Sequence, residues 1–167
     1  MKIVKAKRKD LKFLLQIYNF YVEKNLFSSK RKIEYLDHKK WFEQDYLKKK
    51  KIFIFISKVN NIRIGYVRYK YIKKNIFEVS IALKKNYTGQ GLGLKFLSIS
   101  LKKFLKKKNY FIISKVKKNN RNSISCFIKN NFKKLVFRND YFNLKNRNDY
   151  FFFKYVDKKT LIGNNKI

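Results

Sequence analysis

Cysteine, histidine, proline and glycine are all scarce in this chain of 167 residues. Cys126 is the only cysteine and His38 the only histidine, proline is absent, and there are five glycines. A single cysteine excludes an internal disulfide and a metal site built from cysteines. Any Ser-His-Asp or Cys-His mechanism would have to use His38. We expect no metal, and we expect Cys126 to pack in a helix rather than act as a nucleophile.

Long apolar runs are also missing. No run approaches the roughly 18 apolar residues that a membrane span needs, and the first residues, MKIVKAKRKD, lack the apolar segment of a secretory signal. We therefore expect a cytoplasmic protein with no membrane partner. The length and the hydrophobic content of 45% predict one domain with a real core, over residues 1–157, and a loose tail over 158–167.

Acidic residues are few: 44 Lys and Arg stand against 10 Asp and Glu, which gives a formal net charge of +34. Such a charge attracts the phosphates of nucleic acids. The lysines are spread along the whole chain, however, and Asn, Ile, Phe and Tyr are abundant while proline is absent, as an AT-biased genome would dictate for any protein. We therefore expect no specific nucleic-acid partner, although the positive field favours any anionic ligand.

Hydrophobic periodicity predicts a mixed α/β domain without repeats or linkers. The expected order is strand, two helices, three strands, helix, strand, helix and two strands, or about seven strands and four helices around a central, mostly antiparallel sheet. The expected strands are residues 1–7, 51–57, 62–72, 76–83, 110–116, 133–137 and 150–156. The expected helices begin after Asp10, run over about 34–47, begin at Gly91 and run over 122–130.

Three of the five glycines fall within residues 86–94, NYTGQGLGL, between an expected strand and an expected helix. Glycine serves where the backbone turns with positive φ or approaches a ligand closely. The first N–H groups of a helix have no intrahelical partner and lie at the positive end of its dipole, so they bind anions such as phosphate. Neither a Walker lysine followed by Ser or Thr nor the Rossmann spacing is present. A tight turn that serves packing alone is the structural alternative.

This turn resembles a signature of the GNAT superfamily of acyl-CoA-dependent N-acetyltransferases: Gln or Arg, two residues, Gly, one residue, then Gly or Ala. Residues 88–93, TGQGLG, match both glycines and depart at Thr88. A second signature is Asn, two residues, Ala or Ser, an aromatic four further on and a closing Gly-Phe. It is similar to Asn120, Ser123, Phe127 and residues 131–132, where asparagine replaces glycine. The element order matches the family fold over essentially the entire chain.

The resemblance implies an enzyme that transfers the acetyl group of acetyl-CoA directly to a primary amine in a ternary complex. A backbone N–H near Ala82 and Leu83 would polarise the thioester carbonyl. Family members commonly place a tyrosine, which protonates the leaving thiolate, where this chain has Phe127; Tyr87, Tyr141 and Tyr150 are the candidates to replace it. The residues implied to bind acetyl-CoA are Ala82, Leu83, Thr88, Gly89, Gln90, Gly91, Leu92, Gly93, Asn120 and Phe127.

Glu78 is the expected catalytic residue. An amine is mostly an ammonium ion near neutral pH, so a base must remove its proton. Glu78 interrupts the apolar strand IFEVSIAL (76–83), and many family members place a glutamate base near this point. The alternative is an outward-facing residue paired with a lysine. Most of the other acidic residues, Asp10 among them, fall in expected helices or turns, where pairing in solvent accounts for them.

The acceptor is suggested by residues 28–42, 64–69 and 78–83, which are similar to the GNAT branch that acetylates nucleotide-linked amino sugars, including enzymes of the pseudaminic acid pathway. The expected substrate-binding residues are His38, Trp41 and Arg68. His38 and Trp41 lie three apart on one expected helix, and Arg68 would meet a diphosphate. The structural alternatives are a hydrogen-bonded core histidine and a solvated strand arginine.

Two other functions stay open. Within enzymes, the alternative is an acetyltransferase of protein N-termini or ribosomal proteins, whose groove would suit peptides. From another class, it is a non-catalytic basic protein that binds acyl-CoA or RNA; Thr88 and Phe127, which depart from the family pattern, keep this alternative open. A monomer and a homodimer are equally compatible with the sequence.

Overall fold

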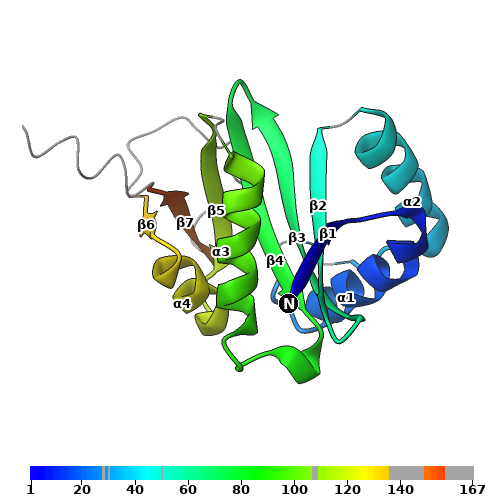
Figure 1. The fold of residues 1–167 in the computed structure, drawn as a ribbon, viewed down its shortest axis with the longest axis horizontal. Coiled ribbons are helices and arrows are strands. Elements are labelled where there is room, and N and C mark those ends of the chain that lie inside the picture. The colour runs from blue at the N-terminus through cyan, green and yellow to red at the C-terminus, as the bar shows by residue number, and fades with distance from the viewer. Residues whose placement is uncertain (28, 30, 50, 107–108, 136–148, 157–167) are drawn as a thin grey trace, which may run out of the picture.

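The computed structural model describes the chain except for residues 28, 30, 50, 107–108, 136–148 and 157–167. In the described part, seven strands form one sheet with the order β1-β2-β3-β4-β5-β7-β6 (Figure 1). All neighbouring strands run antiparallel except β4 and β5, which are parallel. The predicted single mixed α/β domain with seven strands and four helices is confirmed, while the predicted tail lies outside the described residues.

The strands and helices follow the predicted order, with ends that differ by a few residues. The strands are β1 (Lys2–Lys5), β2 (Ile52–Val59), β3 (Ile62–Lys73), β4 (Ile76–Leu83), β5 (Phe111–Lys117), β6 (Phe132–Lys134) and β7 (Tyr150–Tyr155). The helices are α1 (Leu11–Glu23), α2 (Tyr35–Trp41), α3 (Leu92–Leu105) and α4 (Arg121–Lys129). Short helical segments are η1 (Arg8–Asp10), η2 (Phe42–Lys48) and η3 (Lys85–Tyr87). The helix expected over 34–47 is split, since η2 continues α2 with π-helical hydrogen bonding.

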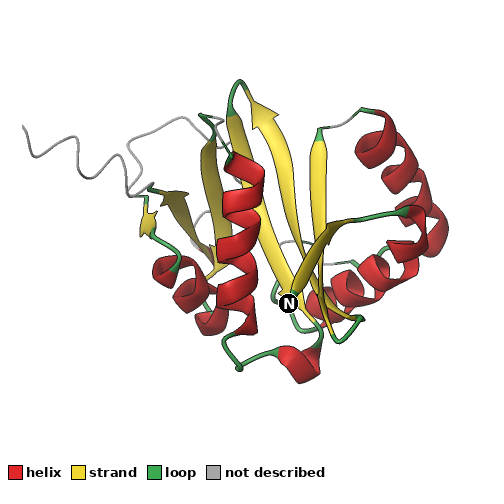
Figure 2. Ribbon diagram, in the orientation of Figure 1, coloured by secondary structure: helices red, strands yellow, loops and turns green. Residues whose placement is uncertain are grey.

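The sheet separates two hydrophobic cores. Helices α1 and α2 lie on one side of it, and α3 and α4 on the other (Figures 1 and 2). Because side chains alternate along a strand, β4 sends Phe77, Val79 and Leu83 toward α3 and Ala82 toward α1. The even-numbered residues of β4, Glu78 among them, therefore share the face covered by α1.

Asp10 is the acidic residue for which the expectation of solvent pairing is wrong. Its side chain is buried, accepts the Lys7 backbone N–H at 2.8 Å and forms an ion pair with Arg63 at 3.0 Å. The ion pair ties the start of α1 to β3. Sequence periodicity predicted the start of the helix, but it contains no signal for the pairing with Arg63, which is 53 positions away.

Close contact between β3 and the end of β4 fixes one wall of the site. At Gly65 of β3, a Cβ atom would lie 2.4 Å from the carbonyl oxygen of Ala82, which is closer than any real side chain approaches. Glycine is therefore required for the two strands to pair here. The turn between β2 and β3 has Asn60 and Asn61 at φ values of 46° and 61°, the left-handed pair that suits a tight hairpin.

A gap opens in the sheet between β4 and β5. The two strands pair only over residues 76–78 and 111–113, although β4 continues to Leu83 and β5 to Lys117. Beyond the paired residues the strands diverge, and β5 continues its pairing on the other side with β7. The gap therefore connects the α1 side of the sheet with the α3 side.

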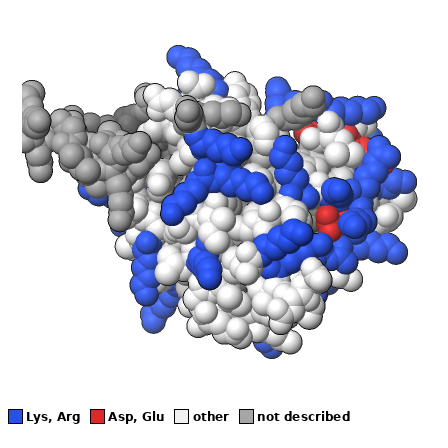
Figure 3. All heavy atoms as spheres, in the orientation of Figure 1, with Lys and Arg blue, Asp and Glu red and all other residues white. Residues whose placement is uncertain are grey.

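Positive charge is scattered rather than gathered over the face shown in Figure 3, where Lys and Arg side chains occur across the surface and acidic side chains are few. Within the described residues, no helix has the length and apolar character needed to traverse a bilayer.

Candidate functional site

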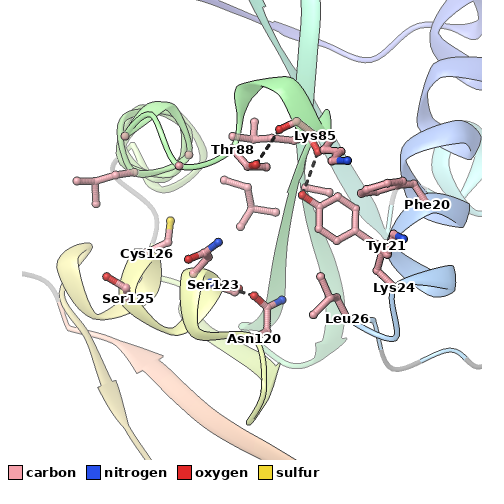
Figure 4. A pocket seen from close by; sticks show the side chains of 18 of the residues that line it. Phe20, Tyr21, Lys24, Leu26, Lys85, Thr88, Asn120, Ser123, Ser125 and Cys126 are labelled. Carbon is pink, nitrogen blue, oxygen red and sulfur yellow. Dashed lines mark hydrogen bonds between the residues drawn. The ribbon is translucent and has the colours of Figure 1, made fainter.

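A pocket of about 480 Å³, here called the turn pocket, opens at the glycine-rich turn. Its walls come from the end of β4, the turn itself, the start of α3, α4, and α1 with the loop that follows it (Figure 4). Three lysines line the turn pocket, Lys24, Lys85 and Lys129, and none of the described residues that line it is acidic. The pocket thus has the charge that an anionic ligand requires.

The turn presents its backbone to this pocket. Gly89 and Gly91 have φ values of 78° and 71°, in the left-handed region that side chains rarely adopt, and a Cβ at either position would meet no atom within 4 Å. Gly91 caps α3 without any side-chain hydrogen bond, and the first intrahelical bond runs from the Lys95 N–H to the Gly91 carbonyl at 3.2 Å. The N–H groups of Leu92, Gly93 and Leu94 precede that bond and have no intrahelical partner. This arrangement fits a diphosphate.

Most of the residues expected to bind acetyl-CoA line the turn pocket. Those that do are Ala82, Leu83, Thr88, Gly89, Gly91, Gly93 and Asn120. Three others lie elsewhere: the exposed Gln90 side chain donates to the Asn86 carbonyl at 2.8 Å, Leu92 packs against the core, and Phe127 lines a neighbouring cavity. Only the backbone atoms of Gln90 and Leu92 are therefore available to bind acetyl-CoA.

Thr88 and Asn120 are held by short-range hydrogen bonds. The Thr88 hydroxyl donates to the Lys85 carbonyl at 2.7 Å, and the Asn120 side-chain oxygen accepts the Ser123 N–H at 3.1 Å, which caps α4. Asn131, which replaces the usual glycine after α4, has a φ of 62° and so takes the left-handed conformation expected of a helix C-terminus.

Tyr21 is a pocket residue that the sequence did not reveal. It lies on α1, and its hydroxyl donates to the Leu83 carbonyl at 3.0 Å (Figure 4). Burial raises the pKa of the Tyr21 phenol, and this hydrogen bond opposes the rise. Its contact with the end of β4 spans 62 positions, for which helix periodicity contains no signal.

Cys126 also lines the turn pocket, and its thiol is a poor nucleophile. Burial raises the pKa of Cys126 to about 11, so the thiol stays protonated near neutral pH. The side chain is half-buried on α4 and packs against the core below α3. These properties agree with the expected packing role.

Two smaller cavities continue from the turn pocket through the sheet. The gap cavity, about 110 Å³, contains Glu78, Ser114 and Lys115 and shares Ile81 and Asn120 with the turn pocket. The helix cavity, about 100 Å³, contains His38 and Trp41. The gap and helix cavities share Tyr18 and Arg68. A chain of cavities therefore leads from the glycine turn to the underside of α2.

Glu78, Arg68, His38 and Trp41, which are far apart in sequence, all line this chain of cavities. Glu78 is half-buried on β4, and in the described part of the chain it forms no ion pair. Lys70 lies opposite Glu78 in the register of β3 and β4, but no ion pair joins the two side chains. Lys115 also senses the carboxylate: burial lowers the pKa of Lys115, and the charge of Glu78 opposes that decrease.

His38 is buried with an unsatisfied ring nitrogen. It is 4% exposed, its ring stacks on Trp41 at 5.2 Å, and its Nε2 has no hydrogen-bond partner in the described structure. Burial lowers the pKa of His38 to about 4; a backbone hydrogen bond with Leu11 opposes this shift and the charge of Arg68 adds to it. His38 is therefore neutral near pH 7. The Nε atom of Arg68 is likewise buried without a partner.

The alternation of β4 decides which backbone N–H faces the gap. Lys84 donates its N–H to Ile64 of β3 at 2.7 Å, so the N–H of Ala82 is also directed to β3. The N–H groups of Ile81 and Leu83 are then directed to the β5 side, where pairing has ended. Of the two residues expected to polarise a carbonyl, Leu83 has the favourable orientation.

Of the tyrosines considered as replacements at the Phe127 position, neither Tyr87 nor Tyr150 lines any of the three cavities. Phe127 itself is buried and packs edge-on against Phe132 at 4.9 Å. Tyr87 packs against the core, and Tyr150 lies beneath Lys115, whose Nζ is 3.9 Å from the ring centre. Tyr141 lies outside the described residues.

Comparison with known proteins identifies relatives of this fold. The model of the acetyltransferase (GNAT) family matches residues 14–132. Ribosomal-protein-alanine N-acetyltransferase from Brucella melitensis is similar in structure, with 20% identity, a TM-score of 0.77, and coverage of 93% of this chain and 99% of that chain. No curated protein matches the chain.

Two further structures contain ligands. Spermidine N-acetyltransferase from Vibrio cholerae, in complex with CoA and spermine, has 15% identity, a TM-score of 0.79, and coverage of 96% of this chain and 97% of that chain. The yncA protein from Salmonella typhimurium, with its cofactor acetyl-CoA, has 19% identity, a TM-score of 0.73 and coverage of 92% of both chains. At such identities the likeness shows a common fold.

Proposed function

Because this chain belongs to the acetyltransferase (GNAT) family and is an acetyl-CoA-dependent N-acetyltransferase, we propose that it acetylates a small amine held in the gap between β4 and β5. The observation that carries the proposal is the chain of cavities through the sheet. It joins the anion-binding turn pocket to a carboxylate, Glu78, and then to the polar residues His38 and Arg68. Two ligands that enter from opposite sides of the sheet would meet beside Glu78.

Acetyl-CoA supplies a thioester, whose acetyl group an amine can accept. The N–H groups of the turn, from Gly89 to the start of α3, would hold the diphosphate, and Lys24, Lys85 and Lys129 would add to the attraction. Asn120 and Phe127 border the passage from the turn pocket to the gap cavity and would contact the pantetheine arm. The N–H of Leu83 would hydrogen bond to the carbonyl oxygen of the acetyl group.

Glu78 would accept the proton of the acceptor's ammonium group, either directly or through a water molecule. It is the only carboxylate among the described residues that line the three cavities. The leaving thiolate needs a proton in turn, and Phe127 has none to give. The Tyr21 phenol in the turn pocket is committed to the Leu83 carbonyl, so we propose that this proton comes from the acceptor amine or from water.

The acceptor that we propose is a nucleotide-linked amino sugar, with His38, Trp41 and Arg68 as its contacts. The unpartnered nitrogens of His38 and Arg68 support a polar acceptor. A peptide N-terminus is the alternative acceptor, favoured by the similarity to an enzyme named for ribosomal-protein alanine. Binding of acyl-CoA or RNA without turnover is the alternative from another class, favoured by the net charge of +34.

An acceptor screen scored by release of free CoA thiol separates these functions. Nucleotide-linked amino sugars should release thiol faster than N-terminal peptides of ribosomal proteins, and release should require the acceptor. Glu78→Gln is the matched variant, because it removes the proposed base and preserves the shape of the side chain. Faster turnover of peptides would overturn the proposed acceptor. Salt-resistant binding of a defined RNA, without affinity for acetyl-CoA or release of thiol, would overturn the enzymatic function of the site.

A further inference from the structure

The charged groups of the gap and helix cavities form an unusual set. Among the described residues that line them are one carboxylate, Glu78, and two cationic side chains, Arg68 and Lys115. A site for an amine acceptor without an anionic group would need only the carboxylate. The two cationic groups indicate that something negative enters these cavities together with the amine.

Arg68 and Glu78 are placed so that one small molecule can reach both. On the shared face of β3 and β4, Arg68 lies opposite Ser80, and Glu78 lies opposite Lys70, so Arg68 and Glu78 are diagonal neighbours. Diagonal neighbours in an antiparallel pair are about 7–8 Å apart. In the described structure no ion pair joins the two side chains. Their charges are therefore left to act on a ligand.

Buried polar atoms without partners add a second, independent observation. Arg68 and His38 both line the helix cavity, and the Nε of Arg68 and the Nε2 of His38 are buried without hydrogen-bond partners in the described structure. A buried polar atom without a partner is destabilising, so it calls for a bound partner. Because neutral His38 can accept a hydrogen bond at Nε2 when its other nitrogen carries the proton, a ligand hydroxyl would satisfy it.

We propose that the part of the acceptor recognised in these cavities is an amino sugar with a phosphate ester a few bonds from its amine. The ammonium group binds at Glu78, the phosphate at Arg68, and a sugar hydroxyl donates to His38 Nε2. The inference rests on the proposed function and deepens it, since it states which feature of the acceptor is recognised. It disfavours a polyamine, which needs several carboxylates, whereas these cavities hold one carboxylate beside two cationic groups in a protein of net charge +34.

Calorimetric titration of four ligands into the enzyme with bound CoA tests this recognition without any turnover. Glucosamine 1-phosphate is the probe; glucosamine lacks the phosphate, glucose 1-phosphate lacks the amine, and spermidine has several amines and no anion. Salt near 0.15 M limits the Debye length to about 8 Å, which suppresses unspecific attraction to the surface lysines. The probe should bind about tenfold to a hundredfold tighter than each of the other three ligands.

Two variants assign the effect to Arg68. Arg68→Gln should weaken binding of glucosamine 1-phosphate to the level of glucosamine, with affinity for acetyl-CoA unchanged. Lys70→Gln is the matched control, because Lys70 lies two residues further along the same face of β3, is exposed, and lines neither cavity. It should leave the affinity of the probe near that of the wild type.

The outcomes separate this inference from the function on which it rests. Equal affinity for the two amino sugars, tighter binding of spermidine, failure of the probe to bind, or equal losses in the Arg68 and Lys70 variants would each overturn the phosphate recognition. If glucosamine without phosphate were bound and acetylated, the proposed function would survive that result. If only peptides were acetylated, the proposed acceptor would fail as well.

Discussion

Glu78 is a carboxylate in a strand whose other members are mainly apolar, and it lines the gap cavity, to which α1 contributes Tyr18 and α4 contributes Phe127. Strand position alone could not distinguish a base from a surface residue. The absence of an ion pair to Glu78 in the described part of the chain leaves the carboxylate available to a ligand.

Replacement of Glu78 by Gln should slow acetyl transfer by about a hundredfold or more while acetyl-CoA affinity stays near wild type. A higher pH supplies neutral amine without help from the enzyme, so the variant should recover part of its deficit in alkaline buffer. The measurement is kcat/KM against pH for both proteins.

Glu43→Gln, on η2, is the charge-matched control for that experiment and should keep wild-type rates. A Glu78 variant that is slow by one constant factor at every pH would point to disturbed geometry instead of a lost base. Full activity in the variant would return Glu78 to the role of a surface residue.

His38 makes the stability of the protein depend on pH. The pKa of His38 falls from 6.5 to about 4 on folding, because burial opposes its charge. Between these values the unfolded chain binds a proton that the folded chain does not, so stability is full above about 6.5 and decreases as the pH falls toward 4. The loss should approach roughly 1.4 kcal/mol per pH unit.

Urea denaturation of wild type and His38→Phe between pH 7 and pH 5 measures this effect. The phenylalanine ring can still stack on Trp41 but cannot titrate, so the variant should show the flatter dependence whatever its absolute stability. Parallel pH dependences for the two proteins would mean that folding does not lower the pKa of His38.

At the scale of elements, the glycine turn is the feature that the sequence predicted best. A strand, three glycines and a helix follow one another within a few residues, so local pattern was enough to locate the turn pocket. The sequence pattern contains no signal for the gap between β4 and β5. The gap depends on where the pairing of these two strands ends, and the strands are distant in sequence. The division of residues 34–47 into α2 and a π-helical segment could not be predicted either, since the π-helical segment has only 7 residues, too few for its longer side-chain period to show in the pattern.

Two substitutions at Gly91 test the turn as the site of acetyl-CoA. Alanine and glutamate both carry the strain of a φ of 71°, on the order of 1–2 kcal/mol, but only glutamate adds a negative charge where a diphosphate would approach the backbone. Calorimetric titration should show acetyl-CoA binding weakened by at least about tenfold in Gly91→Glu relative to Gly91→Ala.

Circular dichroism should confirm that both Gly91 variants remain folded. Equal affinities in the two variants would show that the charge meets no phosphate and that acetyl-CoA binds away from the turn.

At the scale of the whole molecule, the site depends on contacts that sequence periodicity does not encode. Tyr21 of α1 reaches the end of β4, and His38 and Arg68 meet in one cavity although 30 positions separate them in the sequence. Residue type and resemblance made Glu78, His38, Trp41 and Arg68 candidates, and the fold places them along two cavities that share Tyr18 and Arg68. Positive charge, by contrast, spreads over the surface and marks no single site (Figure 3).

The central claim is that acetyl-CoA and the acceptor are held together, on opposite sides of the gap, so that the acetyl group passes directly between them. The unreactive thiol of Cys126, with a pKa raised to about 11, argues against an acetylated enzyme. Initial rates of thiol release, measured while both substrates are varied, test the claim most directly. Double-reciprocal plots should give intersecting lines, as a ternary complex requires. Parallel lines, together with an acetylated protein detected by mass spectrometry before the acceptor is added, would contradict it.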